Sequence, residues 1–327
     1  MSTVGYYTLG RIVTILKEME GSVAKKQRRA AERETTVFMM NGLPGAMGHE
    51  VAAACLKAGF ELAPYALTGT GMPSKVNVDG VAVALLPPSD GAAIDAAFVE
   101  LKRRYAGRLV AIDFTHPTAV NVNAEAYIRH RVPFVMGTTG GDRKKLHADV
   151  GAAGLYAVIA ANMCKQIVAL QSMFETAAQT FPGAWAGYTL DITESHQSTK
   201  ADTSGTAKDI LRNLGLLCPG GGAGGGDFAV SDVKKLREVG AQRAWGVPEA
   251  HLNGHAFHTY TLTSADSSVQ FQFKHNVCGR STYANGVVDA VRFLVAQIKA
   301  AGGGEPGDGR PCGRIFNMID VLRASYD

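Results

Sequence analysis

The sequence predicts an α/β fold: a Rossmann-like, doubly wound parallel sheet with an inserted α+β substrate domain. First, strand-like apolar runs alternate with helical patterns through the first half of the chain, which is the order of βα units. Second, a glycine-rich loop follows the first apolar run and opens a helix, the context of a dinucleotide fingerprint. Third, the pattern changes near residue 164 to a long helix and strictly alternating strands, typical of an antiparallel sheet.

The strands of the nucleotide domain are expected at 36–41, 60–67, 81–86, 109–115, 132–136 and 155–159. Its helices are expected at 49–58, 92–105 and 117–129. The second part should contain a helix at 165–180, a strand at 188–192, a helix at 207–214 and an antiparallel pair at 254–262 and 268–275. A glycine-rich stretch at 219–226 reads as a flexible surface loop. A helix at 283–299 and the apolar segment 314–322 are expected to return to the first domain, joined by a glycine-rich linker at 302–313.

These patterns divide the chain into three parts. We expect an N-terminal extension at 1–35, a dinucleotide-binding domain at 36–163 plus 281–327, and a substrate-binding and oligomerisation domain at 164–280. The extension is basic at Lys25–Arg29, which fits either an organellar transit peptide or a plain extension. Its four glutamates argue against a transit peptide.

Composition excludes several classes of function. The net charge of +4, from 33 basic and 29 acidic residues among 327, is too small and too dispersed to indicate a nucleic-acid partner. No apolar run reaches the length of a membrane span. The five cysteines are scattered without a Cys-x-x-Cys pair, which indicates reduced thiols and no zinc site. We therefore expect a soluble intracellular protein.

The glycine-rich loop has an irregular spacing. Gly42, Gly45 and Gly48 follow the first strand, and Pro44 stands where a second glycine is usual. Such a loop lets backbone amides approach a pyrophosphate, although a plain tight turn is the alternative interpretation. The second strand ends in 66–69 without the acidic residue that binds the ribose of NAD, so we expect NADPH, with NADH as the alternative. Thr68 or Lys75 could contact the 2′-phosphate.

The stretch 194–206 carries the candidate chemistry. It is expected to form a strand end, a loop and a helix start. His196 and Lys200 are two proton donors close together in sequence, and Ser204–Thr206 places hydroxyls and free amides at a helix N-terminus, which suits a carboxylate. Read singly, the serine is an ordinary N-cap and the two basic residues are solvated surface. His255 and His258 should point to opposite faces of a strand, so they are read as structural and no metal site is expected.

These motifs, in this order, resemble the 4-hydroxy-tetrahydrodipicolinate reductase (dihydrodipicolinate reductase) family of lysine biosynthesis. The resemblance runs from about residue 36 to the C-terminus. It is carried by the Gly42–Gly48 loop, Asp113–Thr115, Gly137–Gly140, Ala160–Asn162, Glu194–His196 with Lys200, Ser204–Thr206, and His275–Asn276 with Arg280. The segments 135–143, 195–197 and 317–322 are similar to the plant-type branch of the family.

The resemblance implies roles for individual residues. The cofactor would be held by Gly42, Gly45, Ala46, Met47, Gly137, Thr138, Thr139, Ala160, Asn162 and Met163. Thr68 joins this set from the end of the second strand, as a possible contact of the 2′-phosphate. His196 and Lys200 would be the catalytic acid/base pair. The substrate would be bound by Gln197, Ser204, Gly205, Thr206 and Arg280. Two positions depart from bacterial members, which tend to have a histidine at Gln197 and an aromatic residue at Met163.

The implied reaction is the NAD(P)H-dependent reduction of 4-hydroxy-tetrahydrodipicolinate to tetrahydrodipicolinate on the diaminopimelate route. The expected partners are a small dicarboxylate and further copies of the chain, as a dimer or tetramer. The compartment would be the chloroplast stroma in a photosynthetic eukaryote and the cytoplasm otherwise. Another NADPH-dependent dehydrogenase of similar architecture and a non-catalytic NADP-sensing protein are the competing hypotheses.

Overall fold

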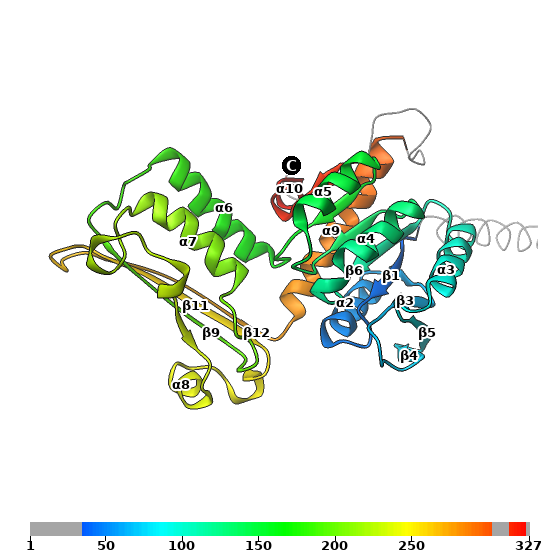
Figure 1. The fold of residues 1–327 in the computed structure, drawn as a ribbon, viewed down its shortest axis with the longest axis horizontal. Helices are drawn as coiled ribbons and strands as arrows, with labels where there is room; N and C mark the ends of the chain where they lie inside the picture. The colour runs from blue at the N-terminus through cyan, green and yellow to red at the C-terminus, as the bar shows by residue number, and fades with distance from the viewer. Residues whose placement is uncertain (1–34, 303–313, 325–327) are drawn as a thin grey trace, which may run out of the picture.

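The computed structural model describes residues 35–302 and 314–324. All but the last residue of the predicted extension at 1–35 and most of the predicted linker at 302–313 therefore lie outside the described residues. Two lobes are visible in Figure 1, one around the strand β1 and the other around β9, β11 and β12. The chain passes from the first lobe to the second before the helix α6 and returns through the helix α9.

A six-stranded parallel sheet forms the centre of the first lobe, in the order β13-β8-β7-β6-β1-β2. Its strands are β1 (Val37–Asn41), β2 (Glu61–Leu62), β6 (Leu109–Asp113), β7 (Phe134–Met136), β8 (Ala157–Ile159) and β13 (Ile315–Phe316). Every residue of β1, β6, β7 and β8 is buried, as expected for a parallel sheet covered on both faces. The predicted Rossmann-like sheet is confirmed.

Helices cover both faces of this sheet. The helices α2 (Ala46–Lys57), α9 (Ser281–Ala300) and α10 (Met318–Ala324) share one apolar core with it. The helices α3 (Gly91–Arg104), α4 (Val120–Arg129) and α5 (Arg143–Ala152) share a second core on the other face. After α9 the chain returns to this sheet as β13, an edge strand that pairs with β8.

The prediction of a single strand at 60–67 is wrong. The segment divides into β2 and β3 (Tyr65–Leu67) because Pro64 has no amide hydrogen to continue the ladder. The strand β3 joins a separate three-stranded sheet, β3-β5-β4, with β5 (Val81–Leu86) and β4 (Lys75–Val78). The strand β4, which the sequence pattern does not predict, pairs antiparallel with β5.

The second lobe is a four-stranded mixed sheet in the order β10-β9-β11-β12. Its strands are β9 (Thr189–His196), β10 (Lys234–Leu236), β11 (His255–Thr263) and β12 (Gln270–Cys278). The helices α6 (Lys165–Thr180) and α7 (Gly205–Leu217) share an apolar core with this sheet through residues such as Phe174, Ile210 and Tyr260. A short helix, α8 (Val239–Ala244), follows β10. The predicted α+β architecture of the insertion and its antiparallel pair are confirmed.

Two local expectations for this lobe need correction. The strand expected at 188–192 continues to His196, because Ser195 and His196 pair with Phe257 and Ala256 of β11. The glycine-rich segment at 219–226 is not wholly a free surface loop: Gly221 is buried, and its carbonyl accepts a hydrogen bond from the Leu190 amide at 2.8 Å. His196 therefore lies on a strand in the sheet rather than on a loop.

The two lobes are joined where Met163 precedes α6. A Cβ atom at Gly286 of α9 would collide with the Met163 carbonyl oxygen, so the helix can pack here only with glycine. Lys165 at the start of α6 forms an ion pair with Asp289 of α9 at 2.5 Å. Among the described helices, none is both long and apolar enough to cross a membrane.

Candidate active site

The loop between β1 and α2 has the features of a phosphate cradle. Gly42 has a φ of 104°, and a Cβ atom there would collide with the Phe114 carbonyl oxygen. Gly45 is the N-cap of α2 and has no side chain to occupy the first amides of the helix, and the first turn contains no acidic residue. Gly45 and Ala46 are exposed, whereas Met47 is half-buried. An anion can therefore reach unpaired helix amides, so these residues fit the pyrophosphate of a dinucleotide.

A buried carboxylate, Asp113, holds the neighbouring loops at the carboxyl edge of the sheet. It is fully buried, and its Oδ1 accepts from the Thr138 hydroxyl at 2.6 Å and from the Thr115 hydroxyl at 2.8 Å. Its Oδ2 accepts from the Tyr127 hydroxyl at 2.6 Å and from Asn123 at 2.9 Å. Burial and then the Asp113 charge raise the pKa of Tyr127 well above its ordinary value, so the phenol remains a donor.

Some of the predicted cofactor residues are accessible to a ligand, whereas the side chains of others are bonded or packed inside the fold. Thr139 is exposed beside the loop, whereas the Thr138 hydroxyl is used internally by Asp113. A Cβ atom at Gly137 would collide with the Phe114 ring, which explains the need for glycine there. The Met163 side chain is buried in the core beneath α9, 2% exposed, so contact with a ligand would have to come from its backbone. Ala160 is half-buried at the end of β8.

The Thr68 hydroxyl donates to the Leu43 carbonyl at 2.7 Å, which ties the end of β3 to the glycine loop. Lys75 is exposed on β4 and pairs with Ala84, the residue that also pairs with Tyr65. Lys75 and Tyr65 therefore lie on either side of Ala84 in the central strand β5. Tyr65 precedes Thr68 by three residues, so Lys75 is not opposite Thr68. Thr68 is the better placed of the two for contact with the ribose end of a cofactor.

Asn162 joins this edge of the sheet to the second lobe. Its amide donates to the Thr206 hydroxyl at 2.9 Å, and its carbonyl oxygen accepts from the Cys164 amide at 2.8 Å. A predicted cofactor residue and a predicted substrate residue are thus in direct contact.

Glu194 is the centre of the second part of the site. It is fully buried on β9, and its Oε1 forms an ion pair with Arg237 Nη2 at 2.5 Å. Its Oε2 accepts from the Ser204 amide at 3.0 Å and lies 3.6 Å from His258 Nε2 and 3.9 Å from His196 Nε2. Burial by itself would raise the pKa of Glu194, but hydrogen bonds from His258, Arg237 and Ser204 lower it to about 2. Glu194 is therefore ionised at neutral pH.

His196 is buried beside this carboxylate, 7% exposed. Its Nε2 lies 3.3 Å from Nε2 of His258, which faces it from β11. Burial, and then the charges of His258, Arg237 and Lys200 against that of Glu194, lower the pKa of His196 to about 3. The imidazole is therefore neutral at physiological pH in the protein without ligand.

Lys200 and the start of α7 form a part of the site that is more exposed than Glu194 and His196. Lys200 Nζ pairs with Asp202 at 2.6 Å, and its side chain is 24% exposed. The Ser204 hydroxyl caps α7 by accepting from the Ala207 amide at 3.4 Å, so the ordinary N-cap interpretation holds for this residue. Gly205 is exposed and Thr206 half-buried; their amides open the helix and have no carbonyl partner within it. Gln197 is half-buried directly after β9.

Arg280 is the most distant of the predicted substrate residues along the chain. It is the N-cap residue of α9, and its guanidinium lies against Gly254, where a Cβ atom would be 3.4 Å from Nη1. This places it at the second crossing between the lobes.

Two residues that no sequence pattern predicts, Arg237 and Gln242, also contact the site. Arg237 follows β10 and, besides Glu194, donates to the carbonyl oxygens of Lys200 at 2.6 Å and Asp202 at 3.2 Å. Gln242 of α8 donates to the His196 carbonyl at 2.7 Å. Neither residue lies in a recognisable motif, so no local signal indicated them.

His258, which the sequence predicts to be structural, contacts both Glu194 and His196. The predicted opposite orientation of the two β11 histidines is nevertheless seen, since His255 bonds Ser195 on the other face at 2.8 Å. The sequence does place His258 at the same alternate positions as Tyr260 and Leu262, on the apolar face of the strand. A histidine on that face was the one sign of its role.

One group among the described residues could hold a metal ion by the convergence of its ligand atoms, namely Glu194, His196 and His258. Both oxygens of Glu194 are already bonded, one of them to the Arg237 guanidinium, whose positive charge opposes a cation at this point. We interpret the group as a hydrogen-bonded cluster.

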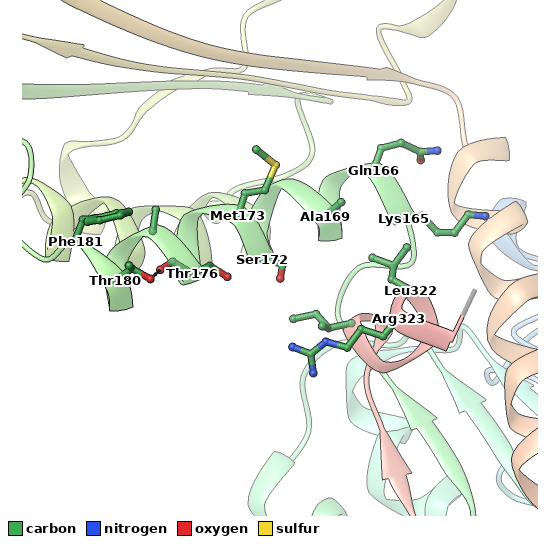
Figure 2. Close-up of a pocket in the computed structure, with 12 residues that line it drawn as sticks. Lys165, Gln166, Ala169, Ser172, Met173, Thr176, Thr180, Phe181, Leu322 and Arg323 are labelled. Atoms are coloured by element: carbon green, nitrogen blue, oxygen red, sulfur yellow. Dashed lines mark hydrogen bonds between the residues drawn. The ribbon is translucent and has the colours of Figure 1, made fainter. Parts of the chain in front are cut away.

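A groove of about 680 Å³ lies apart from these residues, between α6 and α10 (Figure 2). The residues that line it include Met173 and Thr176 of α6 and Leu322 and Arg323 of α10. None of the predicted site residues in the described chain is among those that line it.

Comparison with known proteins supports one family. A model of the dihydrodipicolinate reductase N-terminus matches residues 37–163, and a model of the C-terminus matches residues 166–322. A probable 4-hydroxy-tetrahydrodipicolinate reductase 1, chloroplastic, of Oryza sativa subsp. japonica is 42% identical over 90% of this chain and 80% of the relative. The chloroplastic 4-hydroxy-tetrahydrodipicolinate reductase 1 of Arabidopsis thaliana is 39% identical over 98% of this chain and 91% of its own.

A solved structure shows the same fold. The dipicolinate-bound dihydrodipicolinate reductase from Paenisporosarcina sp. TG-14 superposes with a TM-score of 0.57 at 16% identity, over 86% of this chain and 97% of that one. The two family models together span nearly all of the described residues. The chain therefore belongs to the dihydrodipicolinate reductase family.

Proposed function

We propose that the protein reduces 4-hydroxy-tetrahydrodipicolinate to tetrahydrodipicolinate with NAD(P)H, a step of lysine biosynthesis by way of diaminopimelate. The names of the plant relatives and of the family models support this reaction. The observation that carries it in the structure is the Asn162–Thr206 hydrogen bond of 2.9 Å. It joins the edge of the dinucleotide sheet to the helix terminus that can bind a carboxylate.

The chain contributes binding, orientation and protons. The loop at Gly42–Met47, the ends of β7 and β8, and Thr68 would hold the dinucleotide, whose nicotinamide supplies the hydride when bound. The amides of Gly205 and Thr206 would bind one substrate carboxylate at the N-terminus of α7, where the helix dipole favours an anion. Gln197 and Arg280 are assigned to the remaining polar groups of the substrate.

The two acid candidates differ in their state of charge. His196 is neutral in the protein without ligand, because its pKa is about 3. It can donate a hydrogen bond in that state, as a neutral imidazole, and it becomes a full acid only when a bound dianion raises its pKa. Lys200 is the more exposed cation, and release from Asp202 would let it supply the proton.

The family uses NADH or NADPH, and we propose that this protein prefers NADPH. No acidic residue follows β3 at the position where the ribose 2′-hydroxyl is usually bound, so a 2′-phosphate meets no repulsion. Steady-state rates with NADPH and NADH test this, and a lower KM for NADH would contradict it.

Assembly and location are further proposals. The strand β12 is an edge strand of nine residues, and its unpaired side suits pairing with a second copy of the chain. Light scattering should therefore give a dimer or tetramer. The chloroplastic relatives support the chloroplast stroma as its location if the source is a photosynthetic eukaryote.

The reaction is tested with substrate made in situ from pyruvate and aspartate semialdehyde, following the loss of nicotinamide absorbance. His196→Ala and Lys200→Ala should each lower kcat by about 10²-fold or more, the usual contribution of a positioned acid. Binding of NADPH should be unchanged in both. Lys234→Ala is the matched control, since Lys234 also pairs with an aspartate, Asp191, at 2.5 Å on the same sheet. Tight NADPH binding by the wild type without turnover would contradict the proposal and favour a sensor.

A further inference from the structure

The pair of imidazoles at His196 and His258 shares a single close contact. Their Nε2 atoms are 3.3 Å apart, and Oε2 of Glu194 lies 3.6 Å from that of His258. Two nitrogen atoms at this distance form a hydrogen bond only if one carries a proton and the other does not. The contact therefore requires that one of the two Nε2 atoms donates and the other accepts.

The other nitrogen of His258 decides the direction. Nδ1 of His258 is buried and has no hydrogen-bond partner among the described residues. A neutral imidazole carries one proton, and a buried N–H without an acceptor is rarer and more costly than a bare acceptor in the same position. Nε2 of His258 therefore carries a proton whether the ring is neutral or charged, and Glu194 and His196 can both accept from it.

We propose that His258 and Glu194 are positioning residues that hold His196 in the tautomer with its proton on Nδ1. Nε2 of His196 is then an acceptor directed at fully buried groups, and Nδ1–H is the donor left for a ligand. The part of this inference that concerns the substrate rests on the proposed function: His196 would offer the substrate a hydrogen bond from Nδ1. The same logic, a buried acidic group fixing an imidazole tautomer, operates in catalytic triads.

The surroundings fix the geometry of the donor. The His258 ring stacks on His275 at 4.6 Å between centroids and lies parallel to Tyr260 at 6.3 Å. Arg237 and the Ser204 amide hold the Glu194 carboxylate on its other sides. His258 can therefore present its Nε2–H in one direction only, which is what a positioning role requires.

The tautomer can be measured without any enzyme assay. Nitrogen-15 NMR of the histidine-labelled full chain distinguishes protonated from bare ring nitrogens, and subtraction of a His196→Gln spectrum assigns the signals of His196. The sample contains a chelator, because the same three side chains could bind a trace metal. We expect a protonated Nδ1 and a bare Nε2 in the wild type. A protonated Nε2 on His196 would overturn the proposal.

Variants then test the role of His258. His258→Ala should give a mixture of His196 tautomers, whereas His258→Gln keeps an N–H donor at similar reach and should preserve the wild-type tautomer. His255→Gln is the matched control, since His255 lies on the same strand but bonds Ser195 on the opposite face. An unchanged His196 tautomer in His258→Ala would refute the assignment.

Kinetics connect the tautomer with catalysis. His258→Ala should lower kcat by about 100-fold, the scale of loss when a reacting group is misplaced, without changing the KM for NADPH. His258→Gln should recover most of that rate. Wild-type kcat in His258→Ala would overturn the positioning role. A wild type that shows the expected tautomer but no turnover would instead contradict the proposed function and leave the tautomer assignment in place.

Discussion

Acidification should destabilise the protein through histidines whose pKa is lowered in the fold, and the half-buried His275 offers the clearest measurement. His275 lies on β12, where its ring stacks on His258 and its Nδ1 is buried without a partner among the described residues. Burial, and then the charge of His258, lower the pKa of His275 to about 3. The same side chain in the unfolded chain has a pKa of about 6.5.

The direction of the change in the free energy of unfolding follows from the number of protons that the folded and unfolded chains bind. Below about pH 6.5 the unfolded chain takes up a proton that the folded protein excludes until about pH 3, so the free energy of unfolding falls as the pH falls. The slope is about 1.4 kcal/mol per pH unit for one such histidine. Over the roughly 1.5 units from pH 6.5 to 5 this amounts to about 2 kcal/mol. Glu194 acts at lower pH, since its pKa of about 2 confers stability that is lost between about pH 4.5 and pH 2.

The assay is urea unfolding of wild type and His275→Gln at pH 7, 6 and 5. The free energy of unfolding should fall less steeply with acidification in the variant, by about 1.4 kcal/mol per pH unit below pH 6.5. His116→Gln is the control, because His116 is exposed in the folded protein. If the free energy of unfolding fell equally with pH in wild type and His275→Gln, His275 would take up its proton at the same pH in the folded and unfolded chains. That result would contradict a pKa lowered by burial.

Three further substitutions test contacts that hold the two parts of the site. Gly286→Ala should destabilise the protein by about 1–3 kcal/mol in urea unfolding, because the new methyl group collides with the Met163 carbonyl, and an unchanged midpoint would contradict that packing. Tyr127→Phe removes a hydrogen bond to the buried Asp113 carboxylate and should cost about 1.5–3 kcal/mol; a loss below 0.5 kcal/mol would mean that the network rearranges. Glu194→Gln leaves Arg237 without its buried partner and should cost about 3–5 kcal/mol, with a thermal midpoint equal to wild type as the contrary result.

Local pattern in the sequence determined the parallel sheet and the glycine-rich loop between β1 and α2. Apolar runs such as Val37–Asn41 and the following glycines are contiguous, and short-range sterics dictate what they form. The same holds for the start of α7 at Ser204–Thr206, because a capping residue and its helix are neighbours in the chain. Even the break at Pro64 was in principle readable, since proline cannot donate to a ladder.

Tertiary structure alone decided how the acid groups are tuned. Glu194 meets Arg237, 43 residues later, and His196 meets His258, 62 residues later, through the pairing of β9 with β10 and β11. The neutral state of His196 follows from burial, which depends on what the whole sheet packs against. No local signal carries that information, because desolvation and long-range charge are properties of the assembled fold rather than of neighbouring residues.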